Sequence, residues 1–374
     1  MGLSRHETGV GIFIEQGRRE NEDDWVMFNG RSCFTVAMGL IAVVLTGGGC
    51  ISAKNLGDRL TRHEFEQPHM GTLFKITLYA PSESSARAAS DVAFAKVATL
   101  DGMMTDYDPE SELMRLCRQP INLPVRVSED LFVVLEESLR IARATDGVFD
   151  PTIGPVIRLW RRARRQEILP TPEQIQHAQR SVGWQKLDLD AKTRTVTLLA
   201  PDMQLDLGGI AKGYAADKAL AVLRENGIAR ALVAASGDIA AGDAPPGTKG
   251  WRVFIGAPYS SNTLSKTFLL SNAAVSTSGD AEQFVVIGGH RYSHIVDPRT
   301  GVGLTNRLQV SVLARRAILS DVFATTVCLL GESKGVELIN AQRDMAAILV
   351  SDQGVGGELK VSRDKINVPG VKAE

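Results

Sequence analysis

The sequence predicts an α+β fold, built as one large domain of mixed sheets and helices that could divide into two lobes. The chain has 374 residues, 44% of them hydrophobic, which is enough for a large core. Helical spacing prevails in the first half, and short β-like runs prevail from Ala231 onward. No internal repeat or low-complexity tract interrupts the chain. These observations favour helices packed on sheets from about residue 55 to the C-terminus.

The N-terminal segment predicts export. Residues 1–30 are mostly polar, and an apolar run then extends from Cys33 to Leu45. This run is too short for a membrane span, which needs about 20 residues, whereas a basic flank and a short apolar core are typical of a secretory signal. Because such signals begin at the N-terminus, Met27 is the expected true start and residues 1–26 an extension. A buried N-terminal strand or helix is the alternative.

Cys50 is a candidate lipidation site. Small residues precede it, as in lipoprotein signals, although Gly47 stands where a larger aliphatic residue is usual. A lipid on Cys50 would anchor the chain to the periplasmic side of a bacterial inner membrane. The expected organisation is an extension plus signal peptide over 1–50, a linker over 51–60 and the folded domain over 61–374.

The first half is expected to hold a strand broken near Pro68, two helices, a capped helix start and a hairpin. These cover, in order, Arg62–Leu78, Ser85–Leu100, Glu129–Ala144, Thr171–Gln174 and Lys186–Leu199. The second half is expected to hold mostly short strands. Five of these cover Leu232–Ala235, Val253–Ile255, Ala274–Thr277, Leu308–Leu313 and Ala346–Val350.

A hairpin and two helices complete the second half. The Gly288-Gly289 pair predicts a turn that joins Gln283–Ile287 to Tyr292–Val296. Helical spacing covers Ser320–Leu330 and Glu332–Gln342.

The segment LDLGGIAKGYAAD, from Leu205 to Asp217, predicts an anion site beside a carboxylate. Asp206 precedes a glycine pair, and a helical segment through Lys212 follows. Glycine lets the backbone approach a ligand closely, and a helix N-terminus favours negative charge. A strand-to-helix turn without a ligand is the alternative. In both interpretations the helix is expected to end at Asn226-Gly227.

Asp321 and Thr325 lie four residues apart in a helical segment, so their side chains share one face. A carboxylate and a hydroxyl are hard oxygen donors suited to Mg²⁺, which takes few protein ligands. The alternative is a helix start that Ser320 or Asp321 merely caps.

His294 follows an expected strand and precedes the turn Asp297-Pro298. An imidazole at such a position can act as a general base near neutral pH. A turn in which these residues serve only geometry is the alternative.

The loop from Gly147 to Pro155 carries Phe149 and Asp150, which could cover and hydrogen-bond a flat ring. Alternatively, the loop is a rigid connector and Phe149 a core anchor. The arginine run from Arg161 to Arg165 favours a solvated helix face, with anionic lipid contact as a second interpretation.

Several function classes have no support. The net charge of −1 gives no case for nucleic acid binding. The four cysteines form no C-x-x-C pair, so neither a zinc site nor a disulfide framework is indicated. The phosphate loops of the common nucleotide folds, the G-x-S-x-G elbow and H-E-x-x-H do not occur.

The order of these segments resembles the ApbE-type FAD:protein FMN transferases. Seven segments carry the resemblance: MGT at Met70–Thr72, DYDPESEL at Asp106–Leu113, GVFDPTIGP…LW at Gly147–Trp160, LDLGGIAKGYAAD at Leu205–Asp217, STSGD at Ser276–Asp280, HIVDPRTG at His294–Gly301 and SDVFATT at Ser320–Thr326. The resemblance implies an ApbE-like, T-fold-related catalytic domain over 61–374.

The resemblance also implies an activity. Members of the family cleave FAD with Mg²⁺, move FMN onto a Thr or Ser hydroxyl of a target flavoprotein and release AMP. They are exported and often lipid-anchored. The implied partners are FAD and such a flavoprotein, with no nucleic acid.

Site residues follow by position in the matching motifs. His294 would be the base and Asp321 a second catalytic residue. Asp321, Thr325 and a backbone oxygen near Gly209 would hold Mg²⁺. The implied FAD contacts are Met70, Tyr107, Val148, Phe149, Asp150, Asp206, Lys212 and Ile295.

The chain departs from the family pattern at VAASGD, Val233–Asp238, where Ser236 replaces a glycine, and at Ser320, where alanine is commoner. Two other functions share the implied site. One is a periplasmic FAD pyrophosphatase, in which water attacks. The other is a non-catalytic flavin-binding or assembly protein.

Overall fold

The computed structural model describes residues 12–14, 60–256, 265–279, 283–351, 358–362 and 366–374. The apolar run, Cys50 and nearly all of the expected linker lie outside these residues, so export and lipidation stay predictions. Within the described part, no helix is both long and apolar enough to span a membrane.

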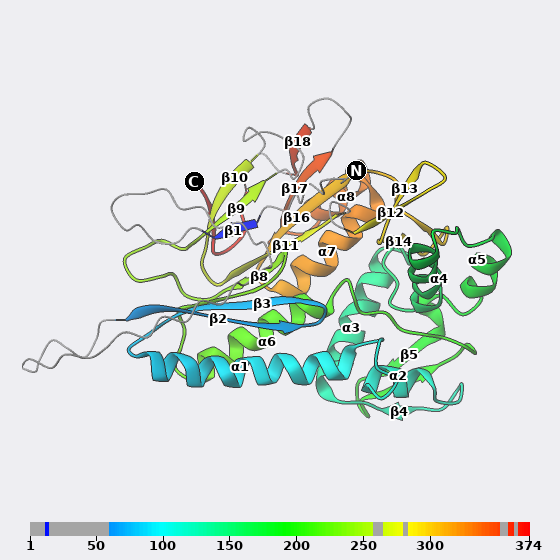
Figure 1. The fold of residues 1–374 in the computed structure, drawn as a ribbon, viewed down its shortest axis with the longest axis horizontal. Helices are drawn as coiled ribbons and strands as arrows, with labels where there is room; N and C mark the ends of the chain where they lie inside the picture. The colour runs from blue at the N-terminus through cyan, green and yellow to red at the C-terminus, as the bar shows by residue number, and fades with distance from the viewer. Residues whose placement is uncertain (1–11, 15–59, 257–264, 280–282, 352–357, 363–365) are drawn as a thin grey trace, which may run out of the picture.

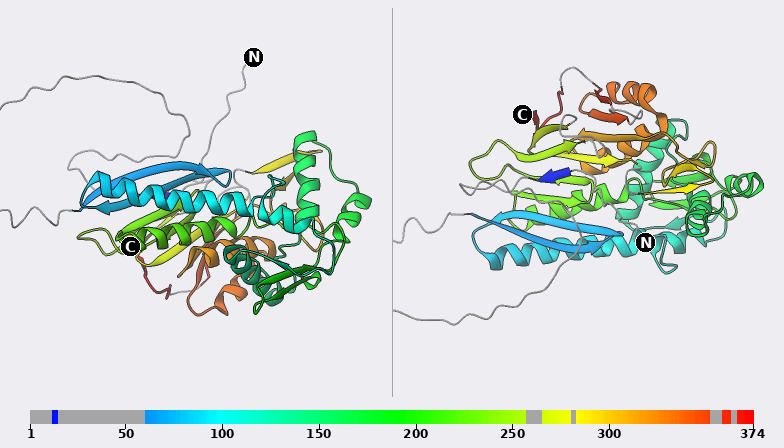
Figure 2. Two further views of the ribbon diagram at one scale, coloured as in Figure 1. Left: turned by 90° about the horizontal axis from the view of Figure 1, so that it is seen from below. Right: turned by 45° about the horizontal axis from the view of Figure 1, so that its top comes forward.

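An antiparallel sheet of eight strands forms the centre of the molecule (Figure 1). Across the sheet the strands are β18 (Glu358–Val361), β17 (Ala346–Ser351), β16 (Leu308–Ala314), β11 (Ala273–Ser278), β8 (Asp238–Ala241), β7 (Ala231–Ala235), β3 (Thr72–Ala80) and β2 (Thr61–His69). The β2–β3 hairpin and the β17–β18 hairpin form its two edges (Figure 2). Side chains alternate between the faces of a strand, and β7 shows the result. Val233 and Ala235 enter one core, whereas Leu232 and Ala234 enter another.

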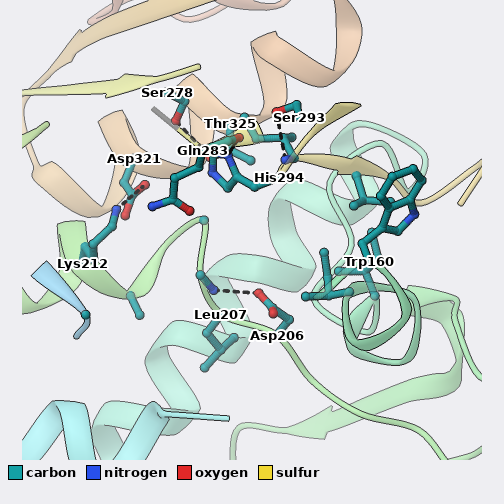
Figure 3. Close-up of a pocket in the computed structure, with 18 of the residues that line it drawn as sticks. Trp160, Asp206, Leu207, Lys212, Ser278, Gln283, Ser293, His294, Asp321 and Thr325 are labelled. Atoms are coloured by element: carbon teal, nitrogen blue, oxygen red, sulfur yellow. Dashed lines mark hydrogen bonds and ion pairs between the residues drawn. The ribbon is translucent and has the colours of Figure 1, made fainter. Parts of the chain in front are cut away.

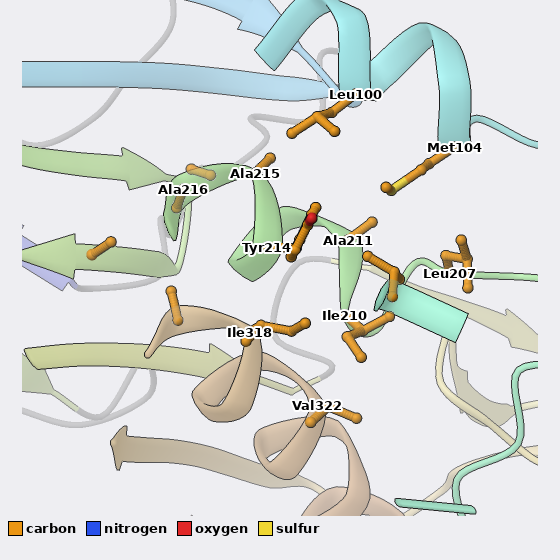
Figure 4. Packing of buried hydrophobic residues seen from close by; sticks show 14 of the residues in the cluster. Leu100, Met104, Leu207, Ile210, Ala211, Tyr214, Ala215, Ala216, Ile318 and Val322 are labelled. Atoms are coloured by element: carbon orange, nitrogen blue, oxygen red, sulfur yellow. The ribbon is translucent and has the colours of Figure 1, made fainter. Parts of the chain in front are cut away.

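Helices cover the first face. They are α1 (Glu83–Met104), α6 (Ala211–Glu225), α7 (Ala317–Leu330) and α8 (Glu332–Asn340). Leu100 of α1, Tyr214 of α6 and Val322 of α7 meet in the main core (Figure 4). This packing fixes the start of α6 against α7, the two helices that carry LDLGGIAKGYAAD and SDVFATT.

A second sheet covers the other face. Its strands are β1 (Ile12–Ile14), β9 (Trp251–Gly256), β10 (Ser265–Leu270) and β19 (Val371–Ala373). Val253, Ile255 and Phe268 are fully or almost fully buried between the two sheets. Residues 12–14, which belong to the expected N-terminal extension, form β1 and pair antiparallel with β9.

The remaining elements gather at one end of the sheet and are called here the end region. They are α2 (Glu112–Cys117), α3 (Glu129–Ala144), α4 (Gly154–Gln166), α5 (Pro172–Gln179), a 3₁₀ turn (Trp184–Lys186) and a small sheet of β4 (Val125–Arg126), β6 (Thr195–Leu198) and β5 (Leu187–Asp190). Two further strand pairs lie beside α4: β12 (Phe284–Ile287) with β13 (His290–Ser293), and β14 (Val296–Asp297) with β15 (Val302–Gly303).

The expected α+β class is confirmed, and most expected elements are present. The helix at Glu129–Ala144 matches α3, and the capping box at Thr171 opens α5. The strand expected to break near Pro68 is a hairpin that turns at Met70 and Gly71, both with positive φ. Glycine accepts that conformation readily, and Met70 is held in it by a bond from its N–H to Asp101 Oδ2, 2.7 Å long.

Two expectations about local structure were wrong. The second strand of the Gly288-Gly289 hairpin ends at Ser293 rather than Val296, because the chain turns at His294 before pairing again as β14. Helix α7 begins at Ala317, so Asp321 lies inside the helix and does not cap it. The helix can begin earlier because the Asp217 carboxylate of α6 accepts bonds from the N–H groups of Ala317 and Ile318.

Candidate active site

A cavity of about 540 Å³ lies between the end of the large sheet and the end region. It is lined by the β2–β3 turn, the start of α6, the ends of β11 and β13, one face of α4 and the inner face of α7 (Figure 3). Every site residue predicted from the sequence lines it except Val148, which is buried in the main core. The chain thus brings together residues that are more than 200 positions apart.

Lys212, Asp238 and Asp321 form a charged cluster on the sheet side of the cavity. The Lys212 ammonium pairs with Asp238 and lies 4.0 Å from Asp321 Oδ1. Burial and the charge of Asp238 raise the pKa of Asp321 to about 7, against the opposing effects of Lys212 and the Gly213 N–H. Burial alone would lower the pKa of Lys212, but attraction to the two carboxylates outweighs it and the pKa is raised. Two buried carboxylates against one ammonium leave an excess of negative charge, which favours a further cation.

Thr325 follows Asp321 by one helical turn and lies beside the glycine pair. Its hydroxyl hydrogen-bonds with Ser278 Oγ at 3.2 Å. A Cβ on Gly209 would stand 3.1 Å from Thr325 Oγ1 and 3.3 Å from the Phe149 ring. A side chain at this position would therefore press on Thr325 and Phe149, and glycine avoids that contact.

These donors fit Mg²⁺. No group of three His, Cys, Asp or Glu side chains suited to a metal occurs among the described residues. Mg²⁺ does not require one, because it usually keeps several waters and binds one or two carboxylates plus substrate phosphates. Asp321, Thr325 and the adjacent backbone of Gly209 supply oxygen donors of that kind.

Asp206 lies opposite this cluster and is held by Arg161 of α4. The guanidinium donates to Asp206 Oδ2 at 3.1 Å, pairs with Asp106 and stacks 4.4 Å from the centre of the Tyr107 ring. Burial and the charge of Asp106 raise the pKa of Asp206, and Arg161 opposes that rise. The interpretation of the arginine run as a solvated face is therefore wrong for Arg161, because carboxylates from two other segments turn it into the cavity.

His294 presents an unprotonated ring nitrogen to the cavity. Its Nδ1 lies 3.0 Å from the carbonyl oxygen of Gln283. Because a carbonyl oxygen only accepts, Nδ1 carries the proton in the neutral ring and Nε2 keeps a free electron pair. Partial burial, with Lys212 and Arg164 nearby, lowers the pKa of His294 below 6.5, although the bond to Gln283 opposes this shift. The ring is thus a neutral base at pH 7.

Apolar side chains form the rest of the wall. Met70, Phe149 and Ile295 line the cavity, and Tyr107 stands at its rim with 76% of its surface exposed.

Asp150 accepts bonds from Thr152 and from the N–H of Trp184, so its carboxylate is already partnered within the protein. Burial raises the pKa of Asp150. The residues that sequence reasoning passed over are Asp101, Asp106, Arg161, Asp238, Ser278 and Gln283.

This arrangement defines a class of protein: an α+β, enzyme-like fold with a cavity that combines a neutral base, hard oxygen donors and an apolar wall. The sequence model of the ApbE family matches residues 70–349, and the chain belongs to that family.

Curated relatives and solved structures agree with this family assignment. The chain is 29% identical over 293 residues to the FAD:protein FMN transferase of Haemophilus influenzae, covering 75% of this chain and 84% of that protein. It is likewise 29% identical over 293 residues to the Salmonella typhimurium protein of the same name, covering 77% and 83%. The flavin transferase ApbE from Vibrio cholerae superposes with a TM-score of 0.74 at 26% identity, covering 81% of this chain and 97% of that one. The apo flavinyl transferase ApbE of Pseudomonas stutzeri gives 0.72 at 26% identity, covering 81% and 95%.

Proposed function

We propose that this chain is an FAD:protein FMN transferase, which moves FMN from FAD onto a Thr or Ser hydroxyl of a target flavoprotein and releases AMP. One observation carries the proposal: His294, with Nε2 free to accept a proton, shares a cavity with the buried carboxylate of Asp321 and the half-buried hydroxyl of Thr325. The shared name of the relatives supports the same activity.

In this proposal His294 activates the acceptor. Its Nε2 takes the proton of the Thr or Ser hydroxyl as the oxygen attacks the phosphorus of the FMN half of FAD. A new P–O bond forms to the acceptor, and the bond from that phosphorus to the bridging oxygen breaks. AMP leaves with the bridging oxygen, so the atoms balance and no oxidant or reductant is needed.

Charge neutralisation is the second requirement, because phosphoryl transfer depends mainly on alignment and electrostatic stabilisation. Mg²⁺ bound by Asp321, Thr325 and the backbone carbonyl of Gly209 would neutralise charge on the phosphates. Lys212, seated between Asp238 and Asp321, adds a fixed positive charge at the same place. Asp206 and the apolar wall would hold the remaining parts of FAD.

The direct test incubates the purified protein with FAD, Mg²⁺ and a flavoprotein domain that contains an acceptor Thr. We expect AMP release together with flavin fluorescence that stays on the acceptor after denaturation. AMP and free FMN without labelled acceptor would identify an FAD pyrophosphatase instead. FAD binding without AMP release would identify a non-catalytic binder.

We also propose that the protein works at the periplasmic side of a bacterial inner membrane, with residues 1–49 removed, Cys50 lipidated and a linker over 51–60 before the domain at 61–374. The short apolar run and the small residues before Cys50 support this. Mass analysis of the mature N-terminus tests it: we expect a chain that begins at lipidated Cys50, and a chain beginning at Met1 would contradict it.

A further inference from the structure

The arginines of α4 are not explained by FAD chemistry alone. Arg161 is partnered by Asp106 and Asp206, but Arg158, Arg162, Arg164 and Arg165 are exposed and make no hydrogen bond or ion pair within the described part of the chain. Like charges three or four residues apart weaken a helix by about 0.2–0.5 kcal/mol per pair. A favourable interaction with the helix C-terminus accounts for Arg164 and Arg165 at most. Helix α4 keeps this unneutralised positive charge beside a cavity. That cost to the helix indicates that the arginine side chains have a function there.

The arginines spread from the cavity to the outer surface. Positions 161 and 164 line the cavity, whereas 158 and 165 do not. Arg158, Arg161 and Arg165 follow the i, i+3, i+7 spacing of one helix face, and Arg164 lies beside Arg161 on the cavity side. We call these four residues the arginine face. Arg162, one turn after Arg158, lies at the edge of this face and does not line the cavity.

The arginine face is rigidly placed at the cavity rim. Trp160 of the same helix is 6% exposed and donates through Nε1 to the carbonyl of Gly301 at 2.8 Å. Its ring lies 5.2 Å from that of Tyr292, so α4 also packs on the β12–β13 hairpin. Arg164 is close enough to His294 to contribute to the lowering of its pKa.

An acceptor protein must pass this rim. A Thr or Ser hydroxyl is only two bonds from Cα, so the acceptor backbone has to enter the cavity mouth for the hydroxyl to reach His294. Extended chain spans about 3.3–3.6 Å per residue, so positions within about three residues of the acceptor lie over the rim. The arginine face would there meet whatever side chains flank the acceptor.

From this geometry we propose that the arginine face is the docking surface for the protein substrate, and that it selects acceptor segments with Asp or Glu close to the modified Thr or Ser. The inference rests on the proposed transferase function. Arginine suits this role because its guanidinium binds carboxylates in bidentate geometry. Rim charges of this kind act mainly on partner choice and on the rate of association.

A membrane is the weaker candidate for the same surface. Basic amphipathic helices bind lipid by burying an apolar face in the headgroup layer. The apolar face of α4, formed by Val156, Trp160 and Ala163, is already buried in a satellite core with α5 and the β12–β13 and β14–β15 strand pairs. Two of the arginines turn into a concave cavity, where a flat lipid surface cannot follow.

The test measures binding separately from chemistry. Two fluorescein-labelled peptides share one central Thr and differ in two flanking positions, Glu in one and Lys in the other. Anisotropy with the full-length protein at low salt should show the Glu peptide binding at least about tenfold tighter, with the preference lost at high salt. The double variant Arg158→Glu/Arg165→Glu should lose or invert the preference. Arg343→Glu, an exposed arginine outside the cavity lining, is the matched control and should keep it.

The outcomes separate this inference from the proposed function. Transfer of FMN to both peptides with equal affinity would overturn the docking proposal and leave the transferase standing. Preferential binding of the Glu peptide without any transfer would do the reverse. FAD affinity, measured in parallel for each variant, shows whether the nucleotide site is intact. Unchanged peptide preference in the double variant, with lost binding to vesicles of anionic phospholipid, would assign the face to lipid and overturn the proposal.

Discussion

The backbone N–H of Gly213 donates to Asp321 Oδ2 at 2.9 Å, which ties the first turn of α6 directly to the carboxylate in the middle of α7. The two helices approach closely here. A Cβ on Gly213 would overlap the carbonyl of Ala317 and stand 2.7 Å from the Cβ of Asp321. The glycine is therefore required by helix packing, and the carboxylate is oriented by a backbone donor that no side-chain change removes.

Gly213→Ala should lower the stability of the protein. The added methyl has no space, so α6 and α7 must separate, at a cost of about 1–3 kcal/mol. The Tm measured by calorimetry should fall. Gly102→Ala in α1 is the matched control: nothing lies within 4 Å of a Cβ there, so alanine should raise stability by about 0.5–1 kcal/mol through helix propensity. Equal Tm changes in the two variants would contradict this account of the helix contact.

Asp217 should make stability depend on pH. Burial raises the pKa of Asp217 to about 6 from 3.8, although the N–H groups of Ala317 and Ile318 and the charges of Arg316 and Lys218 oppose the shift. The folded state then holds the proton more tightly than the unfolded state, so this group's contribution to stability falls as pH rises from about 4 to about 6. Asp217→Asn does not titrate and keeps an acceptor oxygen. The Tm of the variant relative to wild type should rise across that window, whereas parallel Tm curves would rule out the effect.

Most of the fold could be predicted from the sequence, because the patterns that indicate its helices and strands are local. The capping box at Thr171 and the helical spacing of Glu129–Ala144 depend on neighbouring residues, and both elements are present. The start of α7 could not be predicted in the same way. It depends on Asp217, which lies 100 residues earlier and reaches Ala317 only in the folded chain.

The candidate site likewise combines residues that a local sequence pattern reveals with residues that only the folded chain brings together. Motifs located Asp206, His294 and Asp321 because each stands in a segment with recognisable order. Arg161 sits in a run that looks like any solvated helix face, and only the fold turns it between Asp106 and Asp206. No local pattern in the sequence marks such an ion pair.

His294→Ala should retain FAD binding and slow transfer by about 10²–10⁴-fold, the usual contribution of a general base. In the wild-type protein the pKa of His294 is lowered below 6.5, so the neutral base persists as pH falls to that value. The acid limb of kcat/KM that belongs to this group should therefore lie below pH 6.5 and be absent from the variant. An unchanged transfer rate in the variant would remove His294 from the mechanism.

Asp321→Ala should abolish FMN transfer through loss of Mg²⁺ binding. A ligand that binds only the folded state raises stability by RT ln(1 + [L]/Kd), so Mg²⁺ should raise the Tm of wild type and not of the variant. Alanine also leaves the Gly213 N–H without its acceptor. Asp321→Asn keeps an acceptor of the same shape and separates that effect from loss of the charge. Full transfer by the Asn variant at low Mg²⁺ would contradict the metal assignment.

Arg161 should act on FAD through Asp206. The guanidinium bridges Asp106 and Asp206 and stacks on Tyr107, so Arg161→Met would leave two partly buried carboxylates facing one another without a cation. The pKa of Asp206, already raised by burial and by Asp106, should rise further, and FAD affinity should fall. A double-mutant cycle with Asp206→Asn measures the link. Residues in contact show coupling energies of about 0.5–3 kcal/mol, so the two changes together should weaken FAD binding by clearly less than the sum of the single effects. Additive losses would mean that Arg161 contacts the nucleotide on its own account and does not work by holding Asp206 in place.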